Sequence, residues 1–366
     1  MVLESPTNEW QLIEQFLETL QGLPEVHANL GRWESVGSPD EPRHDAQIEL
    51  HVAGRSFTLL IEAKKAVYPR DVREVLWQFR DYGRSQSMGK SADEALPLLV
   101  AESISPGAKD LLRTERVGYF DSGGSLFLPA HGAYLYIDRP PPKTLAKSVR
   151  SLFAGRRAQV LHALLVRHQD WFSVKELAEQ AQVSPATTSQ VLTELERFDW
   201  LATRGQGPSK ERHLKEPGAM LDAWLKQLAS MRAPVLRRYY VPALKADQLV
   251  EHAGHVFGYH QVGYAITHEA AAQRYAPFLS NVSQVRCRLL VGPAADAAID
   301  ELGARAVNEG ANLTVIEAKS LGDLLFRERV GDVWLASPIQ VYLDLLGGEG
   351  RAKEMAEHLR RDRIGF

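Results

Sequence analysis

The stretch Thr58-Leu59-Leu60-Ile61-Glu62-Ala63-Lys64 decides how the first part of this chain is interpreted. An apolar run of this length predicts a buried strand. Alternation along a strand places Glu62 and Lys64 on the same face. A charged pair at the end of a core strand costs desolvation energy unless a ligand or a partner compensates it. The pair is therefore a candidate functional site.

A second copy of the same letters, Ile316-Glu317-Ala318-Lys319, shows that the tetrapeptide alone is not specific. Asp300 precedes Glu317 by the same interval that separates Asp45 from Glu62. However, Asp300 lies in an alanine-rich helical pattern, whereas Asp45 precedes a predicted strand and hairpin. Context therefore favours the N-terminal copy, and the C-terminal copy is expected to be an ordinary surface ion pair.

Composition and charge describe an ordinary globular protein. The 366 residues are 45% hydrophobic and 24% charged, with a formal net charge of -3 and one cysteine. The length suggests two or three domains, and the net charge means that any nucleic-acid binding must come from local patches. The first residues lack the pattern of a signal peptide, and no apolar run reaches membrane-spanning length, so we expect a cytoplasmic protein without a membrane partner.

Three segments are expected, and together they predict a multidomain α/β protein. The first domain spans 1–142 and carries an amphipathic helix around 10–20, strands around 48–52, 57–61, 96–101 and 134–137, and a helix over 70–82. The second spans 150–232, with helices over 156–168, 173–181, 184–198 and 219–231 and a hairpin around 200–214. The third spans 233–366, with strands over 284–291 and 313–317, a helix over 294–308 and a terminal helical region.

The first segment has the residues that a metal-dependent phosphodiesterase needs. Carboxylates suit Mg²⁺, and a lysine near the scissile phosphate stabilises developing charge. Asp45 precedes one hairpin strand, Glu62 and Lys64 end the other, and the next helix carries Gln78. Glu14, on the opening helix, is a further candidate acid.

This arrangement resembles the PD-(D/E)xK, or restriction-endonuclease-like, superfamily. The resemblance implies that Asp45 and Glu62 hold the metal, that Lys64 assists the nucleophile, and that Gln78 completes the catalytic set. Asp45 follows Arg43-His44 and lacks the proline of the namesake motif. A fold of this kind need not cleave DNA, because sites are grafted on folds. An ordinary ion pair at the strand end is the alternative.

The second segment has the pattern of a winged helix-turn-helix: helix, helix, short turn, helix, hairpin. Its third helix would enter a major groove and its hairpin tip would follow a phosphate backbone. The residues expected to contact DNA are Ala186, Thr187, Ser189, Gln190, Thr193, Arg204, Lys210 and Arg212. Residues 151–215 contain nine Lys/Arg against seven Asp/Glu, which is only weakly basic. A protein-interaction module is therefore the alternative.

Two C-terminal stretches, Gly263–Ala272 and Ala336–Leu345, predict helix N-termini, the first capped by Thr267. With the upstream winged helix they resemble the transcriptional-regulator branch of the AbiEi antitoxins of type IV toxin–antitoxin systems. The resemblance implies a DNA-binding winged helix, a nucleotidyltransferase-like C-terminal domain and repression of the protein's own operon. The Gly-Ser turn and paired acids of a working nucleotidyltransferase are absent, so we expect a silent domain. His260 and His268 are expected to be satisfied core or surface histidines.

Three functions follow as hypotheses. The first is a transcriptional regulator that binds double-stranded DNA and needs no cofactor, and that is compatible with a homodimer on a repeated site. The second is a Mg²⁺-dependent DNA endonuclease that uses Asp45, Glu62 and Lys64. The third is a protein that neutralises a nucleotidyltransferase-type toxin.

Overall fold

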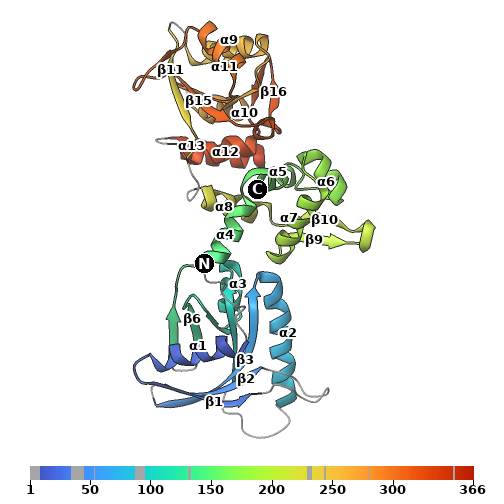
Figure 1. Ribbon diagram of the computed structural model, residues 1–366, viewed down its shortest axis with the longest axis vertical. Coiled ribbons are helices and arrows are strands. Elements are labelled where there is room, and N and C mark those ends of the chain that lie inside the picture. The colour runs from blue at the N-terminus through green and yellow to red at the C-terminus, as the bar shows by residue number, and fades with distance from the viewer. Residues whose placement is uncertain are drawn as a thin grey trace. The chain divides into compact units, whose positions relative to one another are not determined.

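The computed structural model describes residues 9–33, 45–52, 54–86, 95–130, 133–228, 233–242, 245–279, 281–348 and 351–366. They form a mixed α/β protein (Figure 1). The chain divides into two compact units, one made of residues up to Ser151 with Thr193–Asp199, the other of Leu152–Leu192 with Trp200–Phe366. Apart from 150–151 and 193–199, the second and third predicted domains thus fall within one unit.

The first unit is built on a seven-stranded sheet in chain order, β1 to β7. β1, β2 and β3 form an antiparallel meander, β3, β4 and β5 are parallel, and β6 and β7 return antiparallel. The strands are β1 Val26–Trp33, β2 Ala46–Val52, β3 Arg55–Val67, β4 Ala95–Ile104, β5 Gly118–Asp121, β6 Leu126–Ala130 and β7 Ala133–Ile137. The helices are α1 Glu9–Gln21, α2 Pro69–Gln86, α3 Pro106–Thr114 and α4 Lys143–Leu152, which follows Pro140-Pro141-Pro142.

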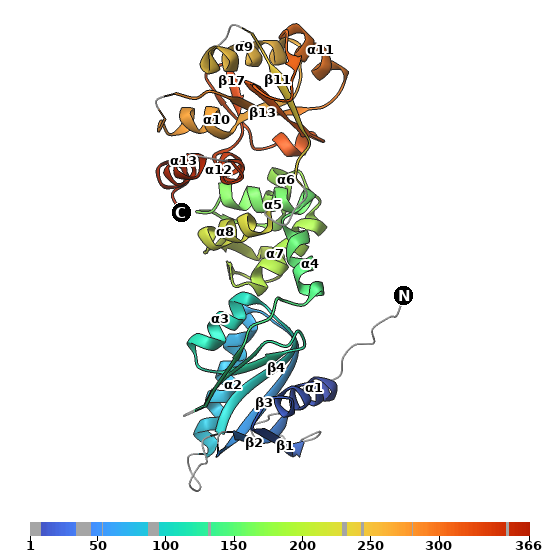
Figure 2. The ribbon, with the colours of Figure 1, turned by 90° about the vertical axis from the view of Figure 1, so that its left-hand side faces the viewer.

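Helices cover both faces of this sheet (Figure 2). The buried side chains of α1, Leu12, Ile13, Phe16 and Leu20, pack with alternate residues of β2, β3 and β4 on one face. α2 and α3 pack on the opposite face, in a second apolar cluster. A strand with helices on both sides must be apolar on both sides, which explains the run Leu59-Leu60-Ile61.

The second unit begins with four helices and a small sheet of order β8-β10-β9. The elements are α5 Gly155–Val166, β8 Trp171–Phe172, α6 Val174–Ala181, α7 Pro185–Arg197, β9 Leu201–Arg204, a 3₁₀ turn Gly207–Ser209, β10 Glu211–Leu214 and α8 Pro217–Leu228. Ser173 and Glu176 have the three-residue spacing of a capping box, and Ser173 caps α6 in a complete box with Glu176. Ser184 caps α7, since its Oγ accepts the Thr187 amide at 3.2 Å.

The rest of the second unit is a seven-stranded mixed sheet of order β14-β11-β15-β13-β12-β17-β16. Its strands are β11 Leu236–Tyr240, β12 Tyr264–Thr267, β13 Val285–Leu290, β14 Arg305–Ala306, β15 Leu313–Ala318, β16 Glu328–Val330 and β17 Val333–Leu335. Its helices are α9 Ala246–Tyr259, α10 His268–Tyr275, α11 Pro293–Glu301, η2 Leu321–Leu324, α12 Pro338–Leu346, α13 Ala352–Leu359 and η3 Arg360–Ile364. In Figure 1, α9 and α11 lie on one side of this sheet and α10, α12 and α13 on the other.

One C-terminal prediction is wrong, and another is confirmed only for the position of the residue. The helix expected over 294–308 ends at Glu301, because Gly303 adopts a positive φ of 62° and Arg305–Ala306 pair as a strand. Thr267 stands at the N-cap of α10, but its hydroxyl makes no capping bond and instead donates to Asp344.

Among the described helices, none combines the length and the apolar character that a membrane crossing requires.

Candidate functional site

The structure brings Asp45, Glu62 and Lys64 together at the junction of β2 and β3. The Asp45 amide donates to the Ile61 carbonyl at 2.8 Å, and the Asp45 carboxylate accepts the Ala63 amide at 2.7 Å. These two bonds flank Glu62 and fix Asp45 beside it. Lys64 Nζ lies 2.8 Å from Glu62 Oε1, so both charged residues of β3 share one face.

The strand register explains why this face holds charge. Phe57, Leu59, Ile61 and Ala63 of β3 belong to the core beneath α1. Alternation therefore directs Glu62 and Lys64 to the face on which α2 packs. The Glu62 side chain is 12% exposed and that of Lys64 35%, so the pair lies at the edge of the apolar cluster.

The pKa values of Glu62 and Lys64 are both raised, but for different reasons. Burial raises the pKa of Glu62, the Lys64 hydrogen bond opposes this, and the charge of Asp45 raises it further. Burial acts to lower the pKa of Lys64, but the hydrogen bond and charge of Glu62 outweigh it, with Asp45 and Glu74 adding to the rise. Lys64 is thus a cation held among carboxylates.

α2 contributes Glu74 and Gln78 to this side of the sheet. Glu74 is among the charges that act on Lys64, and Gln78 lies one helical turn further on the same helix face. The Gln78 Oε1 is buried and has no hydrogen-bond partner. A buried acceptor without a donor costs about 1–3 kcal/mol, so Gln78 is a side chain that a bound molecule could satisfy.

The further candidate acid of the sequence prediction, Glu14, is not supported. Glu14 is exposed on α1, on the side away from its buried stripe. The acid of α1 whose charge acts on Glu62 is Glu9, in the first helical turn.

The carboxylates of Asp45 and Glu62 fit a magnesium ion that takes only a few of its ligands from the protein. In the described part of the chain, no group of three or more His, Cys, Asp and Glu side chains could hold a metal. Asp45 and Glu62 offer two carboxylates, and Mg²⁺ in phosphoryl-transfer sites commonly takes one or two carboxylates, with water and phosphate oxygens completing its shell. The residues therefore suit a metal that arrives with a phosphate substrate.

The second Glu-x-Lys copy has a different environment. Asp300 lies in helix α11, as expected, and Glu317 in β15 pairs with Arg237, whose Nε is 2.7 Å away. Lys319 lies beyond the strand end and is exposed. The partner of Glu317 is thus an arginine from a neighbouring strand, not Lys319 as predicted.

α7 presents the side chains that the sequence assigns to DNA. Ala186, Gln190 and Thr193 are exposed, and Thr187 and Ser189 are half-buried. The opposite side of α7 buries Val191, Leu192 and Leu195. The polar stripe is thus fixed by a packed helix.

The three basic hairpin residues that were expected to contact DNA differ in their exposure. Arg204 is exposed, donates to Glu211 at 2.6 Å and stacks over Trp171 at 4.4 Å. Lys210 is half-buried. Arg212 is 6% exposed, because it lies on β10, the central strand of the small sheet, between Thr203 and Phe172. The prediction that Arg212 contacts DNA therefore conflicts with its burial.

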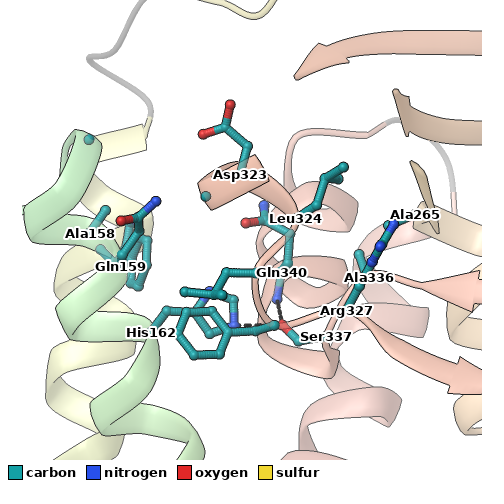
Figure 3. A pocket seen from close by; sticks show the side chains of 15 residues that line it. Ala158, Gln159, His162, Ala265, Asp323, Leu324, Arg327, Ala336, Ser337 and Gln340 are labelled. Carbon is teal, nitrogen blue, oxygen red and sulfur yellow. Dashed lines mark hydrogen bonds between the residues drawn. The ribbon is translucent and has the colours of Figure 1, made fainter. Parts of the chain in front are cut away.

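A small cavity of about 130 Å³ lies where α5 meets η2 and the start of α12 (Figure 3). His162 is buried there, stacks on Phe326 at 4.4 Å and lies 2.6 Å from Ser337 Oγ. Burial lowers the pKa of His162 to about 3, so the imidazole is neutral at physiological pH. Ser337 also caps α12 through the Gln340 amide. Both groups have structural partners, which makes this Ser–His pair a structural contact.

The C-terminal sheet holds a buried ionic pair that the sequence did not reveal. Arg288 Nε donates to Asp344 at 3.0 Å, and Thr267 and Gln340 also bond that carboxylate. These bonds and the Arg288 charge lower the pKa of Asp344 although burial opposes the change. His260 pairs with Glu301 at 2.6 Å, as expected of a satisfied histidine, whereas His268 does not have such a partner at Nδ1.

Comparison of the chain with protein-family models, with curated proteins and with solved structures gives no match. Function is therefore argued from the chemistry of these sites.

Proposed function

We propose that the protein is a DNA-binding transcriptional regulator with a winged helix-turn-helix, of the kind found in AbiEi antitoxins. The observation that carries this proposal is the α6–α7 pair. Its two capped helices are joined by a short turn, and α7 exposes a stripe of small polar side chains. A hairpin with Arg204 at its exposed end follows directly.

In this proposal α7 lies in the major groove. Thr187, Ser189, Gln190 and Thr193 have hydroxyl and amide groups that can bond phosphates or base edges. Arg204 would exchange its ion pair with Glu211 for a phosphate. An exposed pair of this kind contributes little stability, about 0–1 kcal/mol, so the exchange is inexpensive.

The test is a gel-shift titration on the promoter of the protein's own operon. Gln190→Ala is expected to weaken specific binding by about tenfold, since base contacts are worth about 1–3 kcal/mol. The double variant Arg204→Gln/Lys210→Gln is expected to weaken binding to all duplexes and to reduce the salt dependence. Lys353→Gln, an exposed lysine of α13, is the matched control. Unchanged affinity and salt slope in the double variant would refute the wing assignment.

A second candidate function is a Mg²⁺-dependent DNA endonuclease, and the convergence of Asp45, Glu62 and Lys64 favours it. The element order of α1 to β4 agrees with a restriction-endonuclease-like domain. Mg²⁺ would supply Lewis acidity and a metal-activated water. Asp45 and Glu62 would hold the ion, Lys64 would stabilise negative charge at the scissile phosphate, and Gln78 would orient the substrate.

Plasmid cleavage with Mg²⁺ or Mn²⁺ tests this second function. Cleavage by the wild type that is lost in Lys64→Ala and kept in Lys65→Ala would support it, because Lys65 is the adjacent exposed lysine on the other strand face. An intact plasmid under both metals would leave the regulator as the better proposal. The gel shift is read without metal, so the two functions fail independently.

A further inference from the structure

A row of polar residues crosses the C-terminal sheet at one register position. Thr314 of β15 is the register partner of Arg238 on β11 and of Arg286 on β13. Arg286 is also opposite Thr267, which precedes His268. Register partners point to the same face of a sheet, and strand spacing puts the two arginines on the order of 10 Å apart. We call Arg238 and Arg286 the row arginines.

Two other arginines of the same strands show that this sheet normally neutralises its cations. Arg237 on β11 pairs with Glu317, and Arg288 on β13 with Asp344. Within the described residues, the row arginines form neither an ion pair nor a side-chain hydrogen bond. Two like charges on one sheet face without an ion-pair partner are a natural place for an anion.

His268 adds strain at the same place. Its φ is +56°, and among the described non-glycine residues with positive φ it is the buried one, with 8% exposure. Its Nδ1 is buried without a hydrogen-bond partner. A left-handed backbone and an unsatisfied buried atom each cost stability, and such costs cluster at ligand sites.

These residues line a single cavity of about 450 Å³. Leu236 and Ile316 give it an apolar side, and Glu309 is the acid of its lining. With His268 neutral, the row arginines and Glu309 leave the lining with a charge of +1. The volume lies in the range of small-molecule sites.

We propose that this cavity binds a small phosphorylated molecule. Its phosphate lies between the row arginines, above Thr314, and its organic part contacts Leu236 and Ile316. Paired arginine forks recognise phosphate oxygens with fixed geometry. This proposal is independent of whether the protein binds or cuts DNA.

Isothermal titration calorimetry on the full chain tests the site. The probes are AMP, glucose 6-phosphate, inorganic phosphate and, as the phosphate-free control, adenosine. At least one phosphomonoester is expected to bind, with tenfold or greater loss in Arg286→Gln and in Arg238→Gln. Arg305→Gln removes an exposed arginine of β14, which does not line the cavity, and is expected to bind within twofold of wild type.

Several results would overturn the proposal. They are no binding of any phosphate probe, equal losses in all three variants, or equal affinity for adenosine and AMP. Binding of a short DNA duplex that is lost in Arg238→Gln and Arg286→Gln, without binding of any small phosphate, would assign the face to nucleic acid instead. Stronger binding of AMP or glucose 6-phosphate than of inorganic phosphate would support the organic half of the site. Circular dichroism and the melting temperature establish that each variant is folded.

Discussion

Glu62 illustrates how a carboxylate persists at the end of a core strand. Lys64 neutralises it through a 2.8 Å contact, and Asp45 is fixed beside it by two backbone hydrogen bonds. The cluster has more acid than base, which is a costly arrangement without a cation.

Removing Lys64 should expose that cost. In Lys64→Met the groups that lower the pKa of Glu62 are lost, so its pKa rises further. An acid with a raised folded-state pKa contributes stability at low pH and loses it as pH rises. In urea unfolding, the difference in the free energy of unfolding between wild type and variant should therefore be about 1 kcal/mol larger at pH 8 than at pH 5. Lys65→Met is the control, and a gap independent of pH would contradict the assigned coupling.

His162 makes a separate pH prediction. Its pKa falls from 6.5 in the unfolded chain to about 3 in the folded protein. Such a histidine contributes stability above the unfolded pKa and loses it as pH falls toward the folded value. Between pH 7.5 and pH 5, His162 should lower the free energy of unfolding of the wild type by about 2 kcal/mol. This decrease should be absent in His162→Gln. Exposed His255→Gln should retain the wild-type slope, and parallel slopes in all three proteins would disprove the prediction.

At the scale of elements, local signals and register determine different parts of the structure. The capping box of α6 is a local signal: Ser173 and Glu176 bond each other's backbone amides, as their spacing predicts. These bonds also lower the pKa of Glu176.

Ser173→Ala should therefore have two effects. Loss of the cap should destabilise the protein by about 1 kcal/mol, measured by chemical unfolding. Loss of the Ser173 hydroxyl should also raise the pKa of Glu176, measured by NMR titration. Gln190→Ala, at an exposed position within α7, should change neither quantity, and an unshifted Glu176 in Ser173→Ala would argue against the box.

Sequence patterns predict the elements that carry local signals and miss those that do not. β3, α2, α6 and α7 follow from apolar runs, periodicity and caps, and the hairpin context correctly predicts that Asp45 lies beside Glu62. β1 is missed because Val26–Trp33 mixes polar, glycine and apolar residues without clean alternation. The burial of Arg212 is missed because an arginine in a hairpin resembles a surface residue until a third strand pairs with it.

The row arginines could not be predicted, because register creates their proximity. Arg238, Arg286 and Thr314 are far apart in sequence and become neighbours only when β11, β15 and β13 align. The clue in the sequence, two arginines flanking Cys287, does not say which one is neutralised.

At the scale of the second unit, α12 contacts two sites at its two ends. Ser337 at its start bonds His162 of α5, and Gly347 and Gly348 at its end border the larger cavity. Between them, Asp344 accepts hydrogen bonds from Arg288 and Thr267, and Gln340 of the same helix donates to Asp344.

This placement predicts coupling between the proposed ligand and DNA. If the phosphorylated molecule changes DNA affinity by some factor, DNA must change ligand affinity by the same factor. Calorimetry measures the ligand affinity with and without the promoter duplex, and a gel shift measures the DNA affinity with and without the ligand. The two experiments should give the same factor within error, about 5-fold or more. Ser337→Ala should reduce this coupling factor, while the ligand and the DNA each still bind in the absence of the other. An unaltered factor in that variant would exclude α12 as the connection.

If the protein binds DNA and a phosphoester as proposed, the two ends of α12 would have a physiological consequence. Because α12 borders the proposed phosphate cavity and contacts α5 of the proposed DNA-binding segment, it would let promoter occupancy follow the concentration of a cellular phosphoester. The gene under this protein's control would then respond to nutritional state without any change in the amount of the protein.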